Sequence, residues 1–248
     1  MSVSLVKKRL TLEKSKIFLM LDSETVFNSN KRAYELAFVV FDSLTCKILH
    51  KVRYLVRETL MAIGYYKLKR DEWPIYWPSS RLDLFDCLSN PDCLPLADIM
   101  ASLSSIIKDY DISALIAHNI QFDLSAIYGT CVKYGDIDSA LSLLMDLPKL
   151  ELSGFFIHGL PEGMAENMPH KQKSGCMTFK ADHLCPSLLG TSQNHNALED
   201  CQNQISLYKI ALENSGVYAN RGTIYANMVE FHKIQYNNAR FLGNSTLE

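Results

Sequence analysis

The chain has 248 residues, of which 48% are hydrophobic and 21% are charged, so it is long enough for one large domain with a sizeable core. Its 25 basic and 27 acidic residues give a net charge of −2. This balance argues against a protein that coats nucleic acid through a general excess of Lys and Arg, but not against an enzyme whose positive charge comes from bound metal ions.

The cysteines and the apolar segments lead to expectations about the compartment. Seven cysteines occur, an odd number without a CxxC pair, at positions 46, 87, 93, 131, 176, 185 and 201. They favour reduced, intracellular thiols, several of them packed in the core. No apolar region follows the basic residues at 7–9, and no stretch approaches the roughly 20 apolar residues that span a bilayer. We therefore expect a cytoplasmic protein, or a nucleoplasmic one in a eukaryote, without a membrane partner.

The first part of the chain predicts strands. After a polar lead-in at residues 1–15, residues 16–22 form an apolar run that ends in a carboxylate, which is typical of a strand buried on both faces. Residues 35–41 are β-branched and aromatic, and residues 47–56 alternate in polarity. Three strands joined by short links predict an antiparallel meander. Residues 58–95, which hold four prolines and many aromatic side chains, predict irregular structure.

Helical periodicity dominates the rest of the chain. It predicts helices at 96–107 and 121–134, a short one after residue 136, one at 178–189 and a last one after residue 195. The apolar run at 114–117 predicts another buried strand, and residues 151–178 predict a long loop or small insertion. Strands first, then alternating strands and helices, indicate an α/β domain around a mixed sheet.

Four carboxylates lie at the ends of these predicted elements. Asp22 and Glu24 stand two apart at the end of the first strand, so they share a face. Asp123 lies near the first turn of a helix that Asn119 can cap, and Asp200 lies one turn into the last helix. The ends of core elements are where open α/β sheets bind ligands, so we expect these acids to meet.

A histidine precedes the last of these acids by five residues. Five residues on an ideal helix turn about 140° beyond a full circle, so His195 and Asp200 cannot share a helix face. They can converge only if His195 lies at or before the start of the helix, where the backbone is free to turn.

Four acids in one place require a counter-charge. They would repel one another and raise one another's pKa unless a cation neutralises them. Oxygen ligands suit Mg²⁺ or Mn²⁺, and two such ions about 4 Å apart would clamp the attacking and leaving oxygens of a phosphodiester displacement. A neutral His195 could deprotonate the attacking water, a contribution of roughly 10²- to 10⁴-fold in rate.

Three segments resemble the exonuclease motifs of the DEDDh family of 3′–5′ exonucleases. They are Asp22-Ser-Glu24, His118-Asn-Ile-Gln-Phe-Asp123 and His195-Asn-Ala-Leu-Glu-Asp200, which match the family in order, spacing and element type. Glu35-Leu-Ala is similar to the usual start of the family's second strand, and residues 178–184 are similar to the helix before its last motif.

The resemblance covers residues 16–214 and implies a fold and a site. The implied fold is an α/β, RNase H-like domain with a mixed five-stranded sheet flanked by helices. The implied ligands of two Mg²⁺ or Mn²⁺ ions are Asp22, Glu24, Asp123 and Asp200, with His195 as general base. The residues implied to line the terminal-nucleotide site are Ser23, Thr25, Asn119 and Phe122. Residues 58–95 and 151–177 depart from the family as insertions, and residues 215–248 as a C-terminal extension.

The implied activity is 3′–5′ exonuclease cleavage that releases nucleoside 5′-monophosphates from single-stranded ends. DNA is slightly favoured over RNA, because residues 160–214 loosely resemble single-strand-specific DNA exonucleases. The alternatives are a 3′–5′ exoribonuclease or oligoribonuclease and a non-catalytic RNase H-like module that binds nucleic acid or protein. A polymerase or a second copy of the chain is the kind of protein partner that the resemblance suggests.

Two other clusters have competing interpretations. His170, Cys176, His183 and Cys185 offer zinc ligands, but their spacing fits no common zinc finger or knuckle. The aromatic residues between 65 and 77, with basic residues at 67, 69, 70 and 81, suit either stacking on single-stranded bases or packing of an insertion onto the domain.

Overall fold

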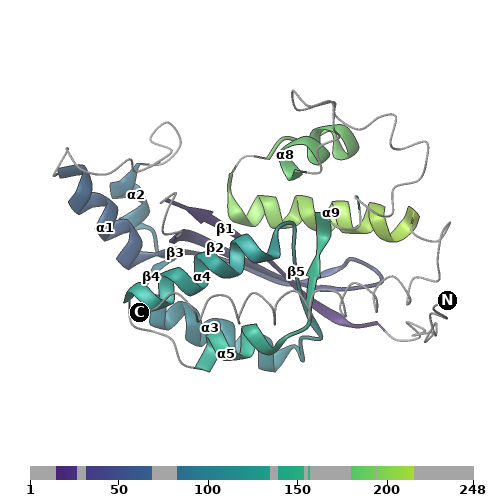
Figure 1. Ribbon diagram of the computed structural model, residues 1–248, viewed down its shortest axis with the longest axis horizontal. Helices are drawn as coiled ribbons and strands as arrows, with labels where there is room; N and C mark the ends of the chain where they lie inside the picture. The colour runs from purple at the N-terminus through teal and green to yellow at the C-terminus, as the bar shows by residue number, and fades with distance from the viewer. Residues whose placement is uncertain are drawn as a thin grey trace, which may run out of the picture.

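The computed structural model describes residues 15–26, 32–68, 83–134, 139–153, 156, 180–193 and 195–214 (Figure 1). The C-terminal extension and nearly all of the lead-in and of the predicted insertion at 151–177 lie outside these residues. Their boundaries therefore stay predictions. Within the described ranges, no helix is both long and apolar enough to cross a membrane.

A mixed six-stranded sheet forms the centre of the molecule, in the order β4-β3-β2-β1-β5-β6. The strands are β1 (Ile17–Thr25), β2 (Ala33–Asp42), β3 (Ile48–Val56), β4 (Cys93–Leu94), β5 (Ala114–Ala117) and β6 (Lys149–Glu151). The first three form the predicted antiparallel meander, whereas β4, β5 and β6 each pair in parallel. The α/β prediction is confirmed, and the two-residue strand β4 brings the sheet to one strand more than the five expected.

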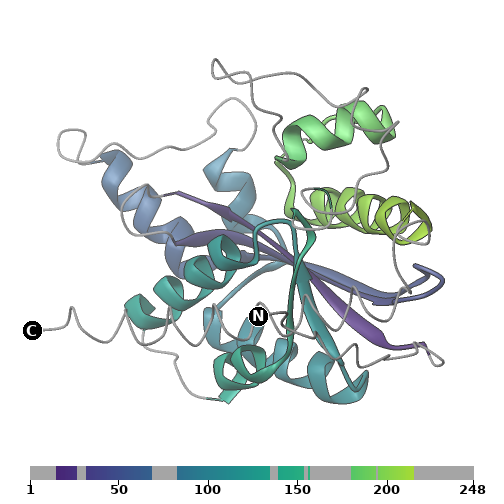
Figure 2. The same cartoon turned by 45° about the vertical axis from the view of Figure 1, so that its right-hand side comes forward.

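Helices cover both faces of this sheet, as Figure 2 shows from a second side. They are α1 (Arg57–Leu68), α2 (Leu84–Ser89), α3 (Leu96–Asp109), α4 (Ile120–Tyr134), α5 (Ser139–Asp146), α8 (Ala181–Leu184), the π-helical turn η1 (Cys185–Leu189) and α9 (Ala197–Asn214). Helices α3, α4 and α5 bury their apolar residues against one face, and α8, η1 and α9 bury theirs against the other. The central strands β1 and β2 are therefore buried on both faces, which explains their nearly continuous apolar runs.

Residues 58–95 are more regular than the sequence predicts. They include most of α1, all of α2 and strand β4. Leu60 and Ile63 of α1 are fully buried in a small cluster with Tyr34 and Leu55. The prediction of irregular structure is wrong for these segments, because an apolar face this short leaves little periodicity to detect among the prolines and aromatic residues.

The described cysteines agree with reduced thiols in a packed core. The six of them are thiols, and all but the partly exposed Cys46 are buried. Cys176 lies outside the described residues, as does His170, so the zinc interpretation of that cluster stays untested.

Candidate metal centre

Strand β1 changes from apolar to acidic along one of its faces. Phe18 and Met20 are fully buried in the cluster that packs against α9. Asp22 and Glu24 continue this row, because side chains two apart on a strand share a face. The two carboxylates therefore share a face of β1, as predicted, and this face is the one that α8 and α9 cover.

The second element of the site is the junction between β5 and α4. Asn119 caps α4 as predicted, since its Oδ1 accepts a hydrogen bond from the Phe122 N–H at 3.2 Å. Asp123 follows in the first turn of the helix and is 4% exposed. The Ser23 hydroxyl donates to Asp123 Oδ1 at 2.6 Å, which joins the start of α4 directly to β1.

The third element is the start of α9. His195 lies two residues before the helix and has a φ of 52°, in the left-handed region that non-glycine residues seldom adopt. This turn confirms the expectation that His195 precedes the helix. Asn196 caps it by accepting from the Glu199 N–H at 3.1 Å, and Asp200 is 2% exposed in the first turn.

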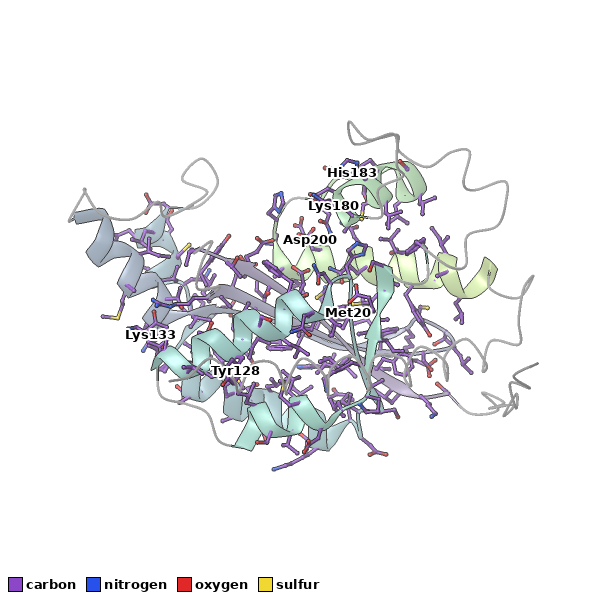
Figure 3. All side chains as sticks on the ribbon, in the orientation of Figure 1. Met20, Tyr128, Lys133, Lys180, His183 and Asp200 are labelled. Atoms are coloured by element: carbon purple, nitrogen blue, oxygen red, sulfur yellow. The ribbon has the colours of Figure 1, made fainter. Side chains whose placement is uncertain are left out.

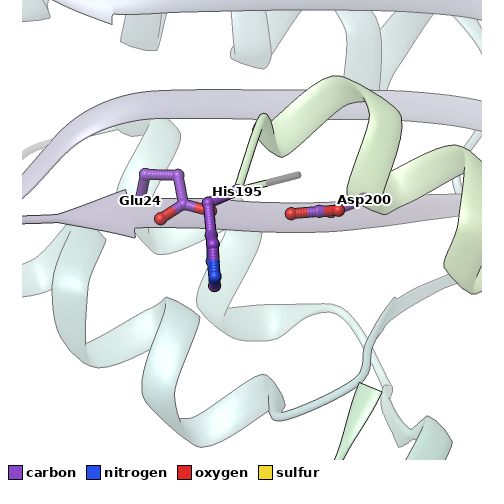
Figure 4. Close-up of side chains that lie close together, drawn as sticks. All are labelled: Glu24, His195 and Asp200. Carbon is purple, nitrogen blue, oxygen red and sulfur yellow. The ribbon is translucent and has the colours of Figure 1, made fainter. Parts of the chain in front are cut away.

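These turns bring the imidazole close to two of the acids (Figure 4). One potential ligand atom each from Glu24, His195 and Asp200 lies within 4.8 Å of the others. His195 Nδ1 is 3.8 Å from Glu24 Oε1, and the histidine side chain is 47% exposed whereas that of Glu24 is 18% exposed. His195 thus stands at the rim of a site whose acids lie deeper.

Figure 3 places Asp200 among the side chains of the whole molecule. Lys180 and His183, at the start of α8, lie on the same side of the molecule as Asp200. Tyr128 and Lys133 on α4 lie away from it. The charge of Asp182 also contributes to the raised pKa of Glu24, which places the start of α8 close to the acidic end of β1.

The charges of the four acids act on one another. Burial raises the pKa of Asp22 well above its usual value, and the charges of Asp123, Glu24 and Asp200 raise it further. Burial and then the charge of Asp200 raise the pKa of Glu24 to about 8. Burial raises the pKa of Asp123 to about 7, against the hydrogen bond from Ser23. A hard divalent cation fits this donor set, because it would relieve both the desolvation and the mutual repulsion.

The four residues predicted to line the terminal-nucleotide site differ in their exposure. Thr25 and Phe122 are partly exposed and Asn119 is exposed, so all three can be reached from outside. Ser23 is 6% exposed, and its hydroxyl donates a hydrogen bond to Asp123. Their contact with substrate stays a prediction.

The sequence analysis assigned no role at the site to three polar side chains that contact its elements, Glu35, Glu151 and Gln204. Glu35 is 1% exposed, and its Oε1 accepts from the Ala197 N–H at 3.0 Å. Arg53 Nε lies 2.9 Å from the same oxygen. Glu151 accepts from the Ile120 N–H at 2.9 Å, at the start of α4. Gln204 donates to Asp22 at 2.7 Å. Two features of the sequence could have pointed to these side chains. Glu35 is a carboxylate inside the apolar run of β2, and Gln204 lies one helical turn after Asp200.

The sequence of this chain matches no protein family and no curated protein. Solved structures of exonuclease I do match its fold. Exonuclease I of E. coli in complex with a dT13 oligonucleotide is 14% identical, with 81% of this chain and 42% of that chain covered and a TM-score of 0.57. The fold is that of the matched part of exonuclease I.

Two further structures of exonuclease I agree with this assignment. The apo structure is 15% identical over 86% of this chain and 44% of that one, with a TM-score of 0.59. The zinc-bound form of the E. coli exonuclease I–single-stranded DNA complex is 14% identical over 85% of this chain and 42% of that one, with a TM-score of 0.57. The chain thus spans less than half the length of the exonuclease I chains that it matches, and it shares with them the RNase H-like α/β fold.

Proposed function

We propose that the chain is a metal-dependent 3′–5′ exonuclease of the DEDDh type, which releases nucleoside 5′-monophosphates from single-stranded ends. The observation that carries this proposal is the cluster of Glu24, Asp200 and His195, with Asp22 buried near enough to be acted on by the charges of the other three acids. A non-catalytic module has no need to bury acids that repel one another, because each unneutralised buried carboxylate costs stability.

Each side chain has a proposed role. Asp22, Glu24, Asp123 and Asp200 would hold two Mg²⁺ or Mn²⁺ ions. When bound, these ions would stabilise the charge that develops on the attacking and leaving oxygens of the phosphodiester. The imidazole of His195 takes a proton from the attacking water, and the new P–O bond forms as the bond to the leaving 3′-oxygen breaks, while that oxygen takes up a proton from solvent.

The substrate is proposed by analogy with proteins of the same fold. Single-stranded DNA is the ligand of the E. coli exonuclease I complexes. This favours DNA over RNA for the present chain, with an exoribonuclease or oligoribonuclease as the alternative. A side-by-side assay on single-stranded DNA, RNA and dinucleotides separates the two, since an oligoribonuclease would prefer the shortest RNA.

The deciding experiment uses single-stranded oligonucleotides labelled at the 3′ or the 5′ end, with Mg²⁺ or Mn²⁺ supplied. We expect 3′-labelled substrate to release labelled mononucleotide at once and 5′-labelled substrate to shorten in a ladder. Asp22→Ala and Asp200→Ala should abolish both, because each removes a carboxylate from the centre of the site. Asp98→Ala, which removes an exposed acid on α3, is the matched control and should leave cleavage unchanged. Resistance of both labelled substrates to the unaltered protein would contradict the proposal.

A further inference from the structure

Gln204 links the three elements that bring the acids together. Its side chain is 1% exposed, on the buried face of α9. Its Nε2 donates to Asp22 Oδ1 at 2.7 Å, and its Oε1 accepts from the His118 N–H at 3.0 Å. A single amide group thus touches the end of β1 and the start of the segment that leads to Asp123.

The orientation of this amide is fixed by its partners. The backbone N–H of His118 can only donate, so the oxygen of Gln204 must face it and the NH₂ group must face Asp22. The contact therefore uses Oδ1 of Asp22 as an acceptor and fixes the direction of that oxygen.

The place of Gln204 on α9 ties it to the last acid as well. It follows Asp200 by four residues, so the two side chains lie on the same helix face one turn apart. If α9 shifted along its axis, Asp200 would move relative to the metal site and the bond to Asp22 would break at the same time. The glutamine therefore couples the position of α9 to that of β1.

We propose that Gln204 is a positioning residue that holds Asp22 in its metal-binding orientation. The inference rests on the proposed function, because it assigns to Asp22 the role of a ligand. A carboxylate with one oxygen hydrogen-bonded cannot rotate freely, so the ion meets a preorganised ligand. The alternative is a purely structural role, in which Gln204 stabilises the contact between α9 and the sheet without acting on the metal.

The test is the Mn²⁺ affinity of Gln204→Met, measured by electron paramagnetic resonance titration of the full chain. Methionine has a similar length and volume but cannot donate to Asp22, and its sulfur is only a weak acceptor for the His118 N–H. We expect Mn²⁺ affinity to fall by about 10- to 100-fold, the usual effect of removing a hydrogen bond to a metal ligand. Gln202→Met makes the same substitution on a partly exposed position of α9 and should leave the affinity unchanged.

Thermal unfolding of the same variants in EDTA separates positioning from structure. A Gln204→Met protein that unfolds at a lower temperature but binds Mn²⁺ as tightly as the unaltered protein would overturn the proposal. If this variant does not fold, Gln204→Glu replaces it, since glutamate keeps the size and the acceptor for the His118 N–H and puts a carboxylate oxygen in place of the NH₂ donor to Asp22. We expect Gln204→Glu to lose at least 10-fold in turnover even at saturating Mn²⁺, and full turnover would overturn the proposal.

Failure of the proposed function has a different signature. In that case the unaltered protein itself would bind no Mn²⁺ and cleave neither labelled oligonucleotide. If the unaltered protein binds and cleaves while the Gln204 variants match it in both, only the role of Gln204 is refuted.

Discussion

His195 occupies a position from which two roles are chemically open. Its Nδ1 approaches Glu24, and one of its nitrogens lies within 4.8 Å of ligand atoms of Glu24 and Asp200. An imidazole there can either activate water or bind metal itself. Its 47% exposure and its place outside α9 favour the first role, because the incoming water and the terminal phosphate must reach the site from the open side.

The variant His195→Ala distinguishes the two roles. If the imidazole is the general base, turnover should fall by about 10²- to 10⁴-fold while Mn²⁺ affinity stays the same. Single-turnover cleavage and Mn²⁺ titration on the same preparation give both numbers. His50→Ala, which removes a histidine that stacks on Tyr110, is the control for the substitution itself. A tenfold or larger loss of Mn²⁺ affinity in His195→Ala would instead make the histidine a ligand.

At the scale of elements, three helices begin in the same way. The first N–H of α3, α4 and α9 each donates to a glutamate from another element: Leu96 to Glu58, Ile120 to Glu151 and Ala197 to Glu35. A carboxylate at a helix N-terminus satisfies a free N–H group and interacts favourably with the helix dipole. Two of these helices carry acids of the candidate site, α4 with Asp123 and α9 with Asp200, so their anchors also set the geometry of the metal centre.

The matched pair Glu35→Ala and Glu58→Ala tests this dual role. Both changes remove the acceptor of a helix N–H, so both should lower the free energy of unfolding by about 1–3 kcal/mol in urea denaturation. Only Glu35→Ala should also weaken Mn²⁺ binding and turnover, because only α9 carries Asp200 and begins beside His195. Equal metal affinity in the two variants would show that the anchor of α9 is dispensable for the site.

Helices and strands with a long apolar pattern could be predicted from the sequence, whereas the short strands and the long-range hydrogen bonds at the site could not. The buried faces of α3 and α9 and the apolar runs of β1, β2 and β5 are long enough to show their period, so these elements were predicted. Strands β4 and β6 have only two and three residues, which is too short for any pattern. The acids were found because each lies in a short segment with a recognisable spacing. The hydrogen bond between Gln204 and Asp22 joins residues 182 positions apart, so no local sequence pattern indicates it.

At the scale of the whole molecule, the acid cluster makes stability depend on pH and on metal. The pKa of Glu24 is raised from 4.5 to about 8 in the folded protein, and that of Asp123 from 3.8 to about 7. Without metal, the folded state therefore holds protons that the unfolded state has already released between roughly pH 4.5 and 8. The stability linked to these groups is fully present below the unfolded values and is lost as pH rises through the folded ones. Asp42, whose pKa is lowered to about 2, titrates below this window.

Metal should reverse this dependence, because it binds the ionised carboxylates and releases their protons. We expect the unfolding temperature of EDTA-treated protein to fall by roughly 5 °C or more between pH 5 and pH 8, since one pKa unit corresponds to about 1.4 kcal/mol and each kcal/mol to about 2–4 °C for a chain of this size. The increase on adding Mg²⁺ should be larger at pH 8 than at pH 5, and Glu24→Gln should flatten the metal-free slope. Scanning calorimetry at four pH values, with and without Mg²⁺, measures all three effects. A metal-free unfolding temperature that is constant or rising across this window would mean that the acids are not held together as the structure places them.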